Sequence, residues 1–143
     1  MTTVFGWDVG GANLKAARVS PAGAVRAANR PFLIREDPRR LVGELRRLAR
    51  VLHAPPGARH AVTMTAELAR VFETKRRGVR FIVDAVCQAF PDGHLSFYTT
   101  DGRFVTADEA SAFPYAVAAA NWSATARLVA LQYPDAILID VGT

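Results

Sequence analysis

The chain has 143 residues, 50% of them apolar and 22% charged, a composition that excludes a disordered or fibrous protein and predicts one globular domain. A domain of this length would bury roughly 70% of the surface of its extended chain, so a sizeable core is possible. The net charge of +5 could promote binding of an anionic small molecule or of nucleic acid. Many of the arginines fall on one predicted helix, however, which favours a solvated helix face over a nucleic-acid site.

The first half of the chain predicts three strands and a helix. The strands form a meander, with turns at Gly10-Gly11 and at residues 21–23. A helix begins at Pro38 and carries apolar residues at helical spacing as far as Leu52, before a Pro-Pro-Gly segment ends it. The expected strands span residues 3–7, 14–20 and 24–34.

The second half alternates strands and helices, and an Asp-Gly pair indicates one hairpin. A meander followed by such alternation predicts an α/β domain whose mixed sheet has flanking helices, in the order of an RNase H-like domain. The expected elements are strands over 61–65, 95–99, 103–105 and 136–141, and helices over 79–90 and, after a re-set at Pro114, up to Gln132.

Other features bear on the compartment and on metal binding. Cys87 is the only cysteine and lies in an apolar helical pattern, so we expect neither a disulfide framework nor a thiolate metal cluster. No apolar stretch reaches about 18 residues, and the N-terminus lacks the features of a signal peptide. We therefore expect a cytoplasmic protein without a membrane partner. His53, His60 and His94 have no mutual ligand spacing and are expected in loops.

The segment FGWDVGGANLK, residues 5–15, places a carboxylate, two glycines, an amide and an ammonium around the first predicted turn. Glycines let a ligand approach the backbone closely, and their N–H groups can point at phosphate oxygens. This pattern favours a phosphate site, although an ordinary hairpin with a capping Asp8 would also explain it. The residues concerned are Asp8, Gly10, Gly11, Asn13 and Lys15.

A second copy of this pattern, DVGT, ends the chain. Asp140 follows an apolar predicted strand and precedes Gly142 and the hydroxyl of Thr143. Asp8 and Asp140 could hold a hydrated divalent cation between them, while the two glycine turns grip a phosphate. The pair of turns strengthens the phosphate interpretation.

Two further segments are ambiguous between structure and function. Thr63, Thr65 and Glu67 follow a strand and could project at its end, but Thr65 could equally cap a short helix that carries Glu67 in its first turn. Asn121 and Trp122 interrupt a run of small residues on a predicted helix. That helix could be a core helix with one satisfied amide, or it could line a site.

Five blocks together resemble a known family: FGWDVGGANLKAARV, AVTMTAELA, FYTTDGRFV, AAANWSATA and ILIDVGT. They are similar to the hydantoinase/oxoprolinase-like proteins of tetrahydromethanopterin-linked one-carbon transfer, in the acetate kinase, sugar kinase, Hsp70 and actin superfamily. The resemblance implies a first RNase H-like domain over residues 1–134, with a phosphate-one loop. Residues 135–143 would then be the first strand and phosphate-two loop of a second, truncated domain.

For the members in methanofuran assembly, the resemblance implies condensation of a furanylmethyl diphosphate with a tyramine-derived phenol, which forms an ether and releases diphosphate. The partner would be a small phosphorylated molecule, with Mg²⁺ as cofactor. By this resemblance, catalytic roles fall to Asp8, Glu67 (taking the phenol proton) and Lys15, Mg²⁺ to Asp8 and Asp140, phosphate to Gly10, Gly11, Asn13, Lys15, Gly142 and Thr143, and the organic substrate to Thr63, Thr65, Asn121 and Trp122.

Three alternatives stay open at this point. An ATP-dependent small-molecule kinase would use the same two loops, and its release of ADP would identify it. An RNase H-like nuclease or resolvase would use Asp8, Glu67 and Asp140 in two-metal chemistry, with steeply salt-dependent binding to branched DNA. A non-catalytic fragment is the third.

Overall fold

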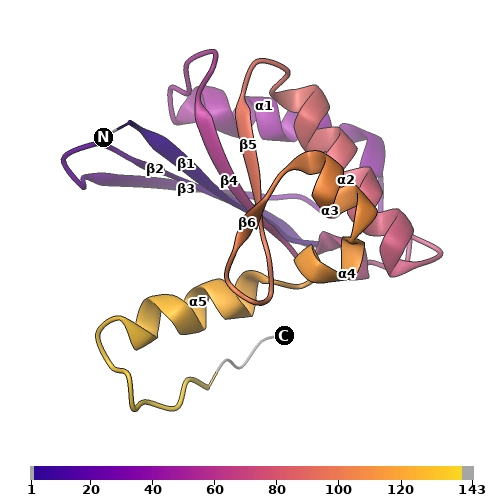
Figure 1. Ribbon diagram of the computed structural model, residues 1–143. Coiled ribbons are helices and arrows are strands. Elements are labelled where there is room, and N and C mark those ends of the chain that lie inside the picture. The colour runs from indigo at the N-terminus through magenta and orange to yellow at the C-terminus, as the bar shows by residue number, and fades with distance from the viewer. Residues whose placement is uncertain (1, 140–143) are drawn as a thin grey trace.

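The computed structural model describes residues 2–139 and contains a six-stranded mixed sheet in the order β3-β2-β1-β4-β5-β6 (Figure 1). The meander β1-β2-β3 is antiparallel, β1, β4 and β5 are parallel, and β6 returns antiparallel to β5. The predicted α/β class and mixed sheet are therefore confirmed. The strands are β1 Val4–Val9, β2 Asn13–Val19, β3 Val25–Pro31, β4 Arg59–Met64, β5 His94–Tyr98 and β6 Phe104–Val105.

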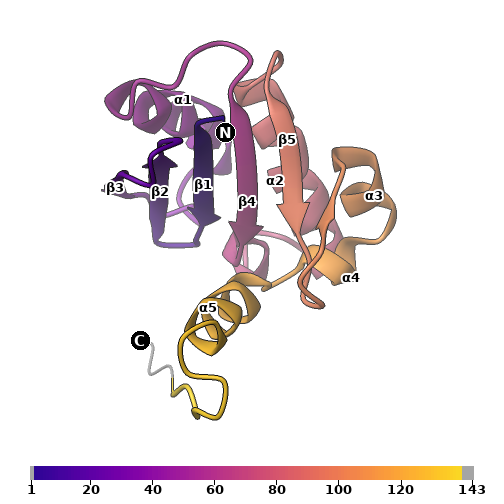
Figure 2. The ribbon, with the colours of Figure 1, turned by 60° about the vertical axis from the view of Figure 1, so that its left-hand side comes forward.

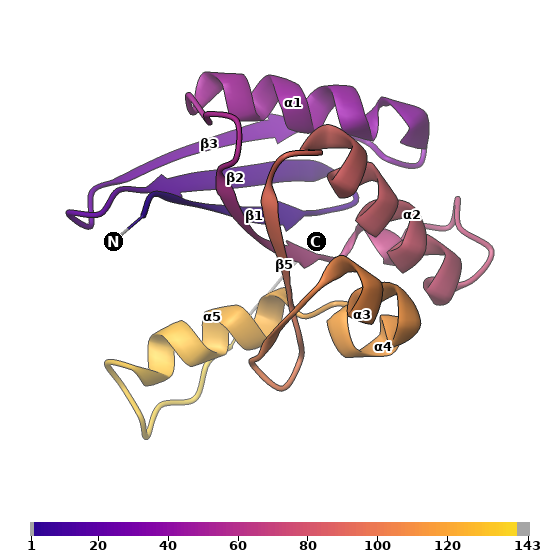
Figure 3. The ribbon, with the colours of Figure 1, turned by 45° about the horizontal axis from the view of Figure 1, so that its top comes forward.

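Helices flank both faces of this sheet. Helices α1 and α2 lie on one face, and α5 lies on the other, near the carboxyl ends of β1 and β4 (Figures 2 and 3). Within residues 2–139, none of the helices has the length and apolar character needed to cross a membrane. The helices are η1 Pro38–Arg40, α1 Leu41–Val51, η2 Ala66–Leu68, α2 Lys75–Ala89, α3 Ala107–Ala112, α4 Pro114–Val117 and α5 Asn121–Ala130.

The side chains of strand β1 alternate between the two faces of the sheet. Phe5, Trp7 and Val9 are buried in the core beneath α1 and α2, whereas Gly6 and Asp8 between them are only partly buried. Successive side chains of a strand point to opposite faces, so Gly6 and Asp8 belong to the face that α5 crosses. We call this second face the open face.

The arginine-rich helix is anchored by a buried carboxylate. Glu44 on α1 is buried and forms ion pairs with Arg30 of β3, with Arg40 at 3.3 Å and with Arg47 at 3.8 Å. Burial alone would raise the pKa of Glu44, but the hydrogen bond and charge of Arg30, together with Arg47 and Arg40, lower it overall. Arg30 thus ties α1 to the edge strand β3, while Arg40 and Arg47 pair with Glu44 from η1 and from α1 itself.

The C-terminal third differs from the sequence prediction. The helix expected after Pro114 is divided at residues 118–120, where Ala119 has a positive φ of 49° that a continuous helix cannot contain. The strand expected over 136–141 is absent from residues 136–139, since no strand of the described chain pairs with them. Ile137 and Ile139 are 90% and 79% exposed. Residues 140 and 141 lie outside the described chain.

The prediction that all three histidines are loop residues was wrong for two of them. His94 begins β5, and His60 lies in β4 with 3% of its surface exposed. Trp7 Nε1 donates a 2.9 Å hydrogen bond to His60 Nδ1, and the Phe90 ring stacks on the imidazole at 4.2 Å. Burial lowers the pKa of His60 from 6.5 to about 4. The imidazole is therefore a neutral part of the core.

This burial predicts an acid-sensitive contribution to stability. The unfolded chain protonates His60 below about pH 6.5 while the folded chain resists until about pH 4, so acidification across that window favours unfolding, by ~3 kcal/mol in full. We expect the stability difference between wild type and His60→Gln, measured by chemical denaturation from pH 7 to pH 4, to shrink steadily. A difference that stays constant over this range would contradict the assignment.

Candidate functional site

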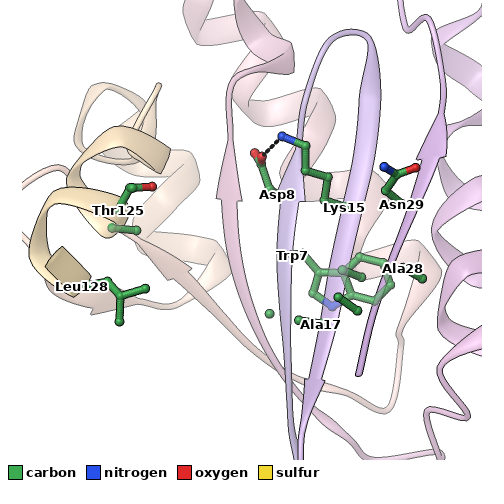
Figure 4. A pocket seen from close by; sticks show the side chains of 12 residues that line it. Trp7, Asp8, Lys15, Ala17, Ala28, Asn29, Thr125 and Leu128 are labelled. Carbon is green, nitrogen blue, oxygen red and sulfur yellow. Dashed lines mark hydrogen bonds and ion pairs between the residues drawn. The ribbon is translucent and has the colours of Figure 1, made fainter. Parts of the chain in front are cut away.

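A cleft of about 880 Å³ lies between the open face of the sheet and α5 (Figure 4). The strands β1, β2 and β3 form its floor, and α5 supplies the opposite side, from which Thr125 and Leu128 project. The polar and apolar side chains that characterise it are Asp8, Lys15, Ala17, Asn29, Thr125 and Leu128.

Strand register places a row of polar side chains across the open face. Asp8 pairs with Lys15 on β2 and with Thr63 on β4, and Lys15 in turn pairs with Asn29 on β3. Paired residues of neighbouring strands project to the same side of a sheet. The row therefore joins three residues predicted for the site, Asp8, Lys15 and Thr63, with Asn29, which was not predicted.

An ion pair lies within this row. Lys15 Nζ is 3.3 Å from Asp8 Oδ2, with side chains that are 60% and 27% exposed (Figure 4). A pair this exposed contributes at most about 1 kcal/mol to stability. Asp8 Oδ1 is buried and has no hydrogen-bond partner within the described residues. The carboxylate thus keeps one oxygen available for a ligand.

Small residues occupy the row of the open face next to the polar row. Gly6 pairs with Ala17 on β2 and with Ala61 on β4, and Ala17 pairs with Ala27 on β3. A Cβ added at Gly6 would meet nothing within 4 Å, so the space above this strand is open. The result is a flat apolar floor beside a charged pair, which suits a planar organic group with a polar end.

The turn between β1 and β2 requires its first glycine. The Gly10 N–H donates a 3.1 Å hydrogen bond to Asn13 O, and a Cβ at Gly10 would lie 2.7 Å from that same oxygen. Gly11 O accepts from the Ile34 N–H at 3.0 Å, which fixes the turn against the chain after β3. The Thr65 N–H donates to Val9 O at 3.0 Å, so Thr65 adjoins this turn.

Glu67 lies in a different environment from the cleft residues. It is 2% exposed, Oε1 accepts a 2.7 Å hydrogen bond from the Ala119 N–H, and Oε2 has no partner among residues 2–139. Burial raises the pKa of Glu67, while hydrogen bonds from its own and the Ala119 N–H and the charge of Lys75 oppose that rise. Thr65 precedes η2 as N-cap but makes no side-chain capping bond. Glu67 does not line the cleft.

Helix α5 presents different residues to the cleft from those predicted. Asn121 Oδ1 accepts from the adjacent Trp122 N–H at 2.9 Å, and Trp122 is 56% exposed. Trp122 lines a hollow with Tyr133 and Leu138, whereas Thr125 and Leu128 line the cleft. Asp140, Gly142 and Thr143, the other predicted site residues, lie outside the described residues.

A second cavity of about 420 Å³ adjoins the cleft on the open face. The two cavities share Gly6, Trp7 and Ala124, so α5 lies between them. Its lining includes Thr63, Tyr98, Gly102, Phe104, Arg127 and Leu131.

A family model described as hydantoinase/oxoprolinase matches residues 59–143, more than half of the chain. The chain belongs to the hydantoinase/oxoprolinase family. A curated protein of Methanocaldococcus jannaschii, named (4-{4-[2-(gamma-L-glutamylamino)ethyl]phenoxymethyl}furan-2-yl)methanamine synthase, is 42% identical over 84 residues. That alignment covers 58% of this chain and 25% of the relative. The chain therefore matches only a quarter of the length of that relative.

The fold of this hydantoinase/oxoprolinase member brings two groups of predicted residues close together. Asp8, Lys15 and Thr63 lie in the polar row, and Gly10, Gly11, Asn13 and Thr65 lie at or beside the adjoining turn. Asn29, Thr125 and Leu128 were missed, because their chemistry carries no motif and only strand register or helix orientation places them. No group of three or more His, Cys, Asp or Glu residues within the described chain is arranged to hold a metal ion.

The turn geometry predicts an asymmetric effect of two alanine substitutions. Gly10→Ala should lower the free energy of unfolding by about 1–3 kcal/mol, because its Cβ would overlap backbone that cannot move independently. Gly43→Ala, on an exposed position of α1 with nothing within 4 Å, is the control and should raise stability by up to about 1 kcal/mol. Equal stability of both variants in urea denaturation would show that the turn does not need glycine.

Proposed function

We propose that the complete protein condenses a furanylmethyl diphosphate with a tyramine-derived phenol, forming an ether and releasing diphosphate, in biosynthesis of a methanofuran-type cofactor. The observation that carries this proposal is the 42% identity to the Methanocaldococcus jannaschii synthase. The name of that relative describes a product in which a phenoxymethyl ether joins a furan to a phenyl ring with a γ-L-glutamylaminoethyl group. The flat floor beside the Asp8–Lys15 pair would accommodate such rings.

The proposal includes a finer assignment of the fold. The sheet order β3-β2-β1-β4-β5, with an antiparallel meander and two parallel strands, supports an RNase H-like domain of the actin-like superfamily. On this assignment residues 1–134 form the first domain, and residues 135–143 begin the second with a phosphate-two loop. The β1–β2 turn would be the phosphate-one loop.

Stabilising the diphosphate as it leaves would be the main catalytic task. A furanylmethyl carbon can carry developing positive charge, so the barrier depends on the leaving group. Lys15 has an exposed ammonium beside the turn, and the Gly11 N–H donates no hydrogen bond within residues 2–139. The Gly10 N–H is already bound to Asn13 O, so Gly10 would shape the loop and Gly11, Asn13 and Lys15 would contact phosphate.

Asp8 fits the magnesium role proposed for it. Its buried Oδ1 lacks a partner within the described chain and belongs to a side chain that lines the cleft. Mg²⁺ is commonly held by one or two carboxylates together with substrate phosphates, so Asp8 with Asp140 would suffice. When bound, Mg²⁺ would neutralise the charge that develops on the diphosphate. Lys15 would then turn from Asp8 toward a phosphate oxygen.

Substitution of the two aspartates would test the phosphate site. In the complete protein, Asp8→Asn and Asp140→Asn should each lower the rate of diphosphate release about 100-fold or more and weaken its dependence on Mg²⁺. Asp84→Asn, at an exposed position of α2, is the matched control and should be neutral. If both variants release diphosphate at the wild-type rate, the phosphate site lies elsewhere, and release of ADP would favour the kinase alternative.

Glu67 is proposed to take the phenol proton, which requires the phenol to reach a carboxyl group that is 2% exposed and does not line the cleft. Its raised pKa makes the carboxylate a stronger base than an exposed one, and its unpartnered Oε2 could accept a proton. The competing role is structural, because Oε1 holds the Ala119 N–H at the junction between α4 and α5. Both roles use the same carboxyl group. Taking a proton requires its negative charge, whereas holding the Ala119 N–H requires only an oxygen that accepts a hydrogen bond.

Glu67→Gln would separate these roles. Glutamine keeps an oxygen for the Ala119 N–H but removes the charge, whose burial costs stability as the pH rises from 4.5 through the raised pKa. At pH 7 we expect thermal stability equal to or above wild type, together with at least about a 100-fold loss of kcat. A stable variant with full activity would leave Glu67 only its structural role.

A further inference from the structure

The hydroxyl of Tyr98 is buried without a partner. Tyr98 ends β5, one residue after Phe97, which pairs with the core residue Val62, so Tyr98 faces the open side of the sheet next to Thr63. It is 7% exposed and lines the 420 Å³ cavity, and its hydroxyl has no hydrogen-bond partner within residues 2–139. Burial of an unsatisfied hydroxyl is unfavourable, and a ligand group that bonds this hydroxyl would remove that cost.

A guanidinium lines the same cavity. Arg127 reaches from α5 over the β5–β6 turn, where a Cβ at Gly102 would overlap its head group. The nearby Asp101 is already paired with Arg103, at 2.8 Å between Nε and Oδ2. No carboxylate of the described chain lies within 4.0 Å of the Arg127 guanidinium. Arg127, which is exposed, therefore brings to this cavity a positive charge that has no ion-pair partner among residues 2–139.

We propose that this second cavity binds a carboxylate, with Arg127 supplying the charge and the Tyr98 hydroxyl a hydrogen bond. A carboxylate accepts hydrogen bonds only, and both groups can donate. Thr63 Oγ1 already donates to Trp7 O at 3.1 Å, so it supplies no donor. Phe104 and Leu131 make the other walls apolar, and one guanidinium matches a single negative charge better than a diphosphate.

This inference rests on the proposed function and extends it to the far end of the phenolic substrate. The name of the relative includes a γ-L-glutamylamino group, which carries an α-carboxylate. The second cavity shares Gly6, Trp7 and Ala124 with the main cleft. A phenol on the apolar floor could therefore extend past α5, with its glutamyl carboxylate between Arg127 and Tyr98.

Calorimetric titration of the complete protein with three probes would test the subsite: γ-glutamyltyramine, tyramine, and γ-glutamylethylamide, which has the glutamyl group without a phenol. Wild type should bind γ-glutamyltyramine about tenfold or more tightly than tyramine, since a charge-assisted bond is worth this factor. Arg127→Gln should abolish that ratio and leave tyramine affinity unchanged. Arg103→Gln, whose guanidinium is paired with Asp101, is the matched control and should retain the ratio.

Tyr98→Phe removes only the hydroxyl and should reduce the ratio several-fold without lowering the Tm, because no group within residues 2–139 bonds that hydroxyl. Three results would overturn the subsite. One is a lowered Tm of Tyr98→Phe, and another is equal affinity of wild type for γ-glutamyltyramine and tyramine. The third is an equal effect of Arg127→Gln on the affinities for these two phenols. Arg127-dependent binding of γ-glutamylethylamide in a protein that forms no ether would uphold the subsite and reject the proposed reaction. If Arg127→Gln still forms the ether with an unchanged KM for γ-glutamyltyramine, the proposed reaction is upheld and the subsite is rejected.

Discussion

The position of β1 in the centre of the sheet determines both the core and the site. It hydrogen-bonds to β2 on one side and to β4 on the other, so its two-residue alternation sets the register of both neighbours. The core side of β1 carries Phe5, Trp7 and Val9, and the residues between them, Gly6 and Asp8, lie on the open face. A slip of one residue would bury Asp8 in the core and expose Trp7, whose indole bonds His60. Stability of the core thus fixes where the acidic group of the site projects.

The placement of α5 depends on a different set of contacts. The helix follows a junction at which Ala119 adopts a positive φ, and the buried Glu67 accepts a hydrogen bond from its N–H. Ser123 Oγ donates a 2.8 Å hydrogen bond to Thr100 O, which ties α5 to the start of the β5–β6 turn. Small residues on the open face leave room beneath it. Both cavities therefore owe their shape to one helix held near its first turn.

Local sequence signals predicted the fold well where each element carries its own pattern. The meander, α1, α2, β4 and the β5–β6 hairpin follow from turn residues and apolar periodicity, and the structure confirms them. Local sequence patterns gave wrong predictions where contacts with residues distant in sequence decide the secondary structure or the burial. Apolar residues 136–139 have strand character but no neighbouring strand among the described residues, and the alanine-rich helix breaks where Glu67 captures the Ala119 N–H. His60 was misplaced because its burial depends on Trp7 and Phe90, which are distant in sequence.

The site was predictable to the extent that motif residues lie at strand ends. Asp8, Lys15 and the glycine turn could be found from spacing, but Asn29, Thr125 and Arg127 come from elements whose relative placement only the tertiary fold determines. Buried oxygens of Asp8 and Tyr98 that have no partner within residues 2–139 give an independent indication of the same region. Each such group costs about 1–3 kcal/mol, and both belong to residues that line open-face cavities. Their cost is explained if ligand groups, rather than protein groups, complete their bonds.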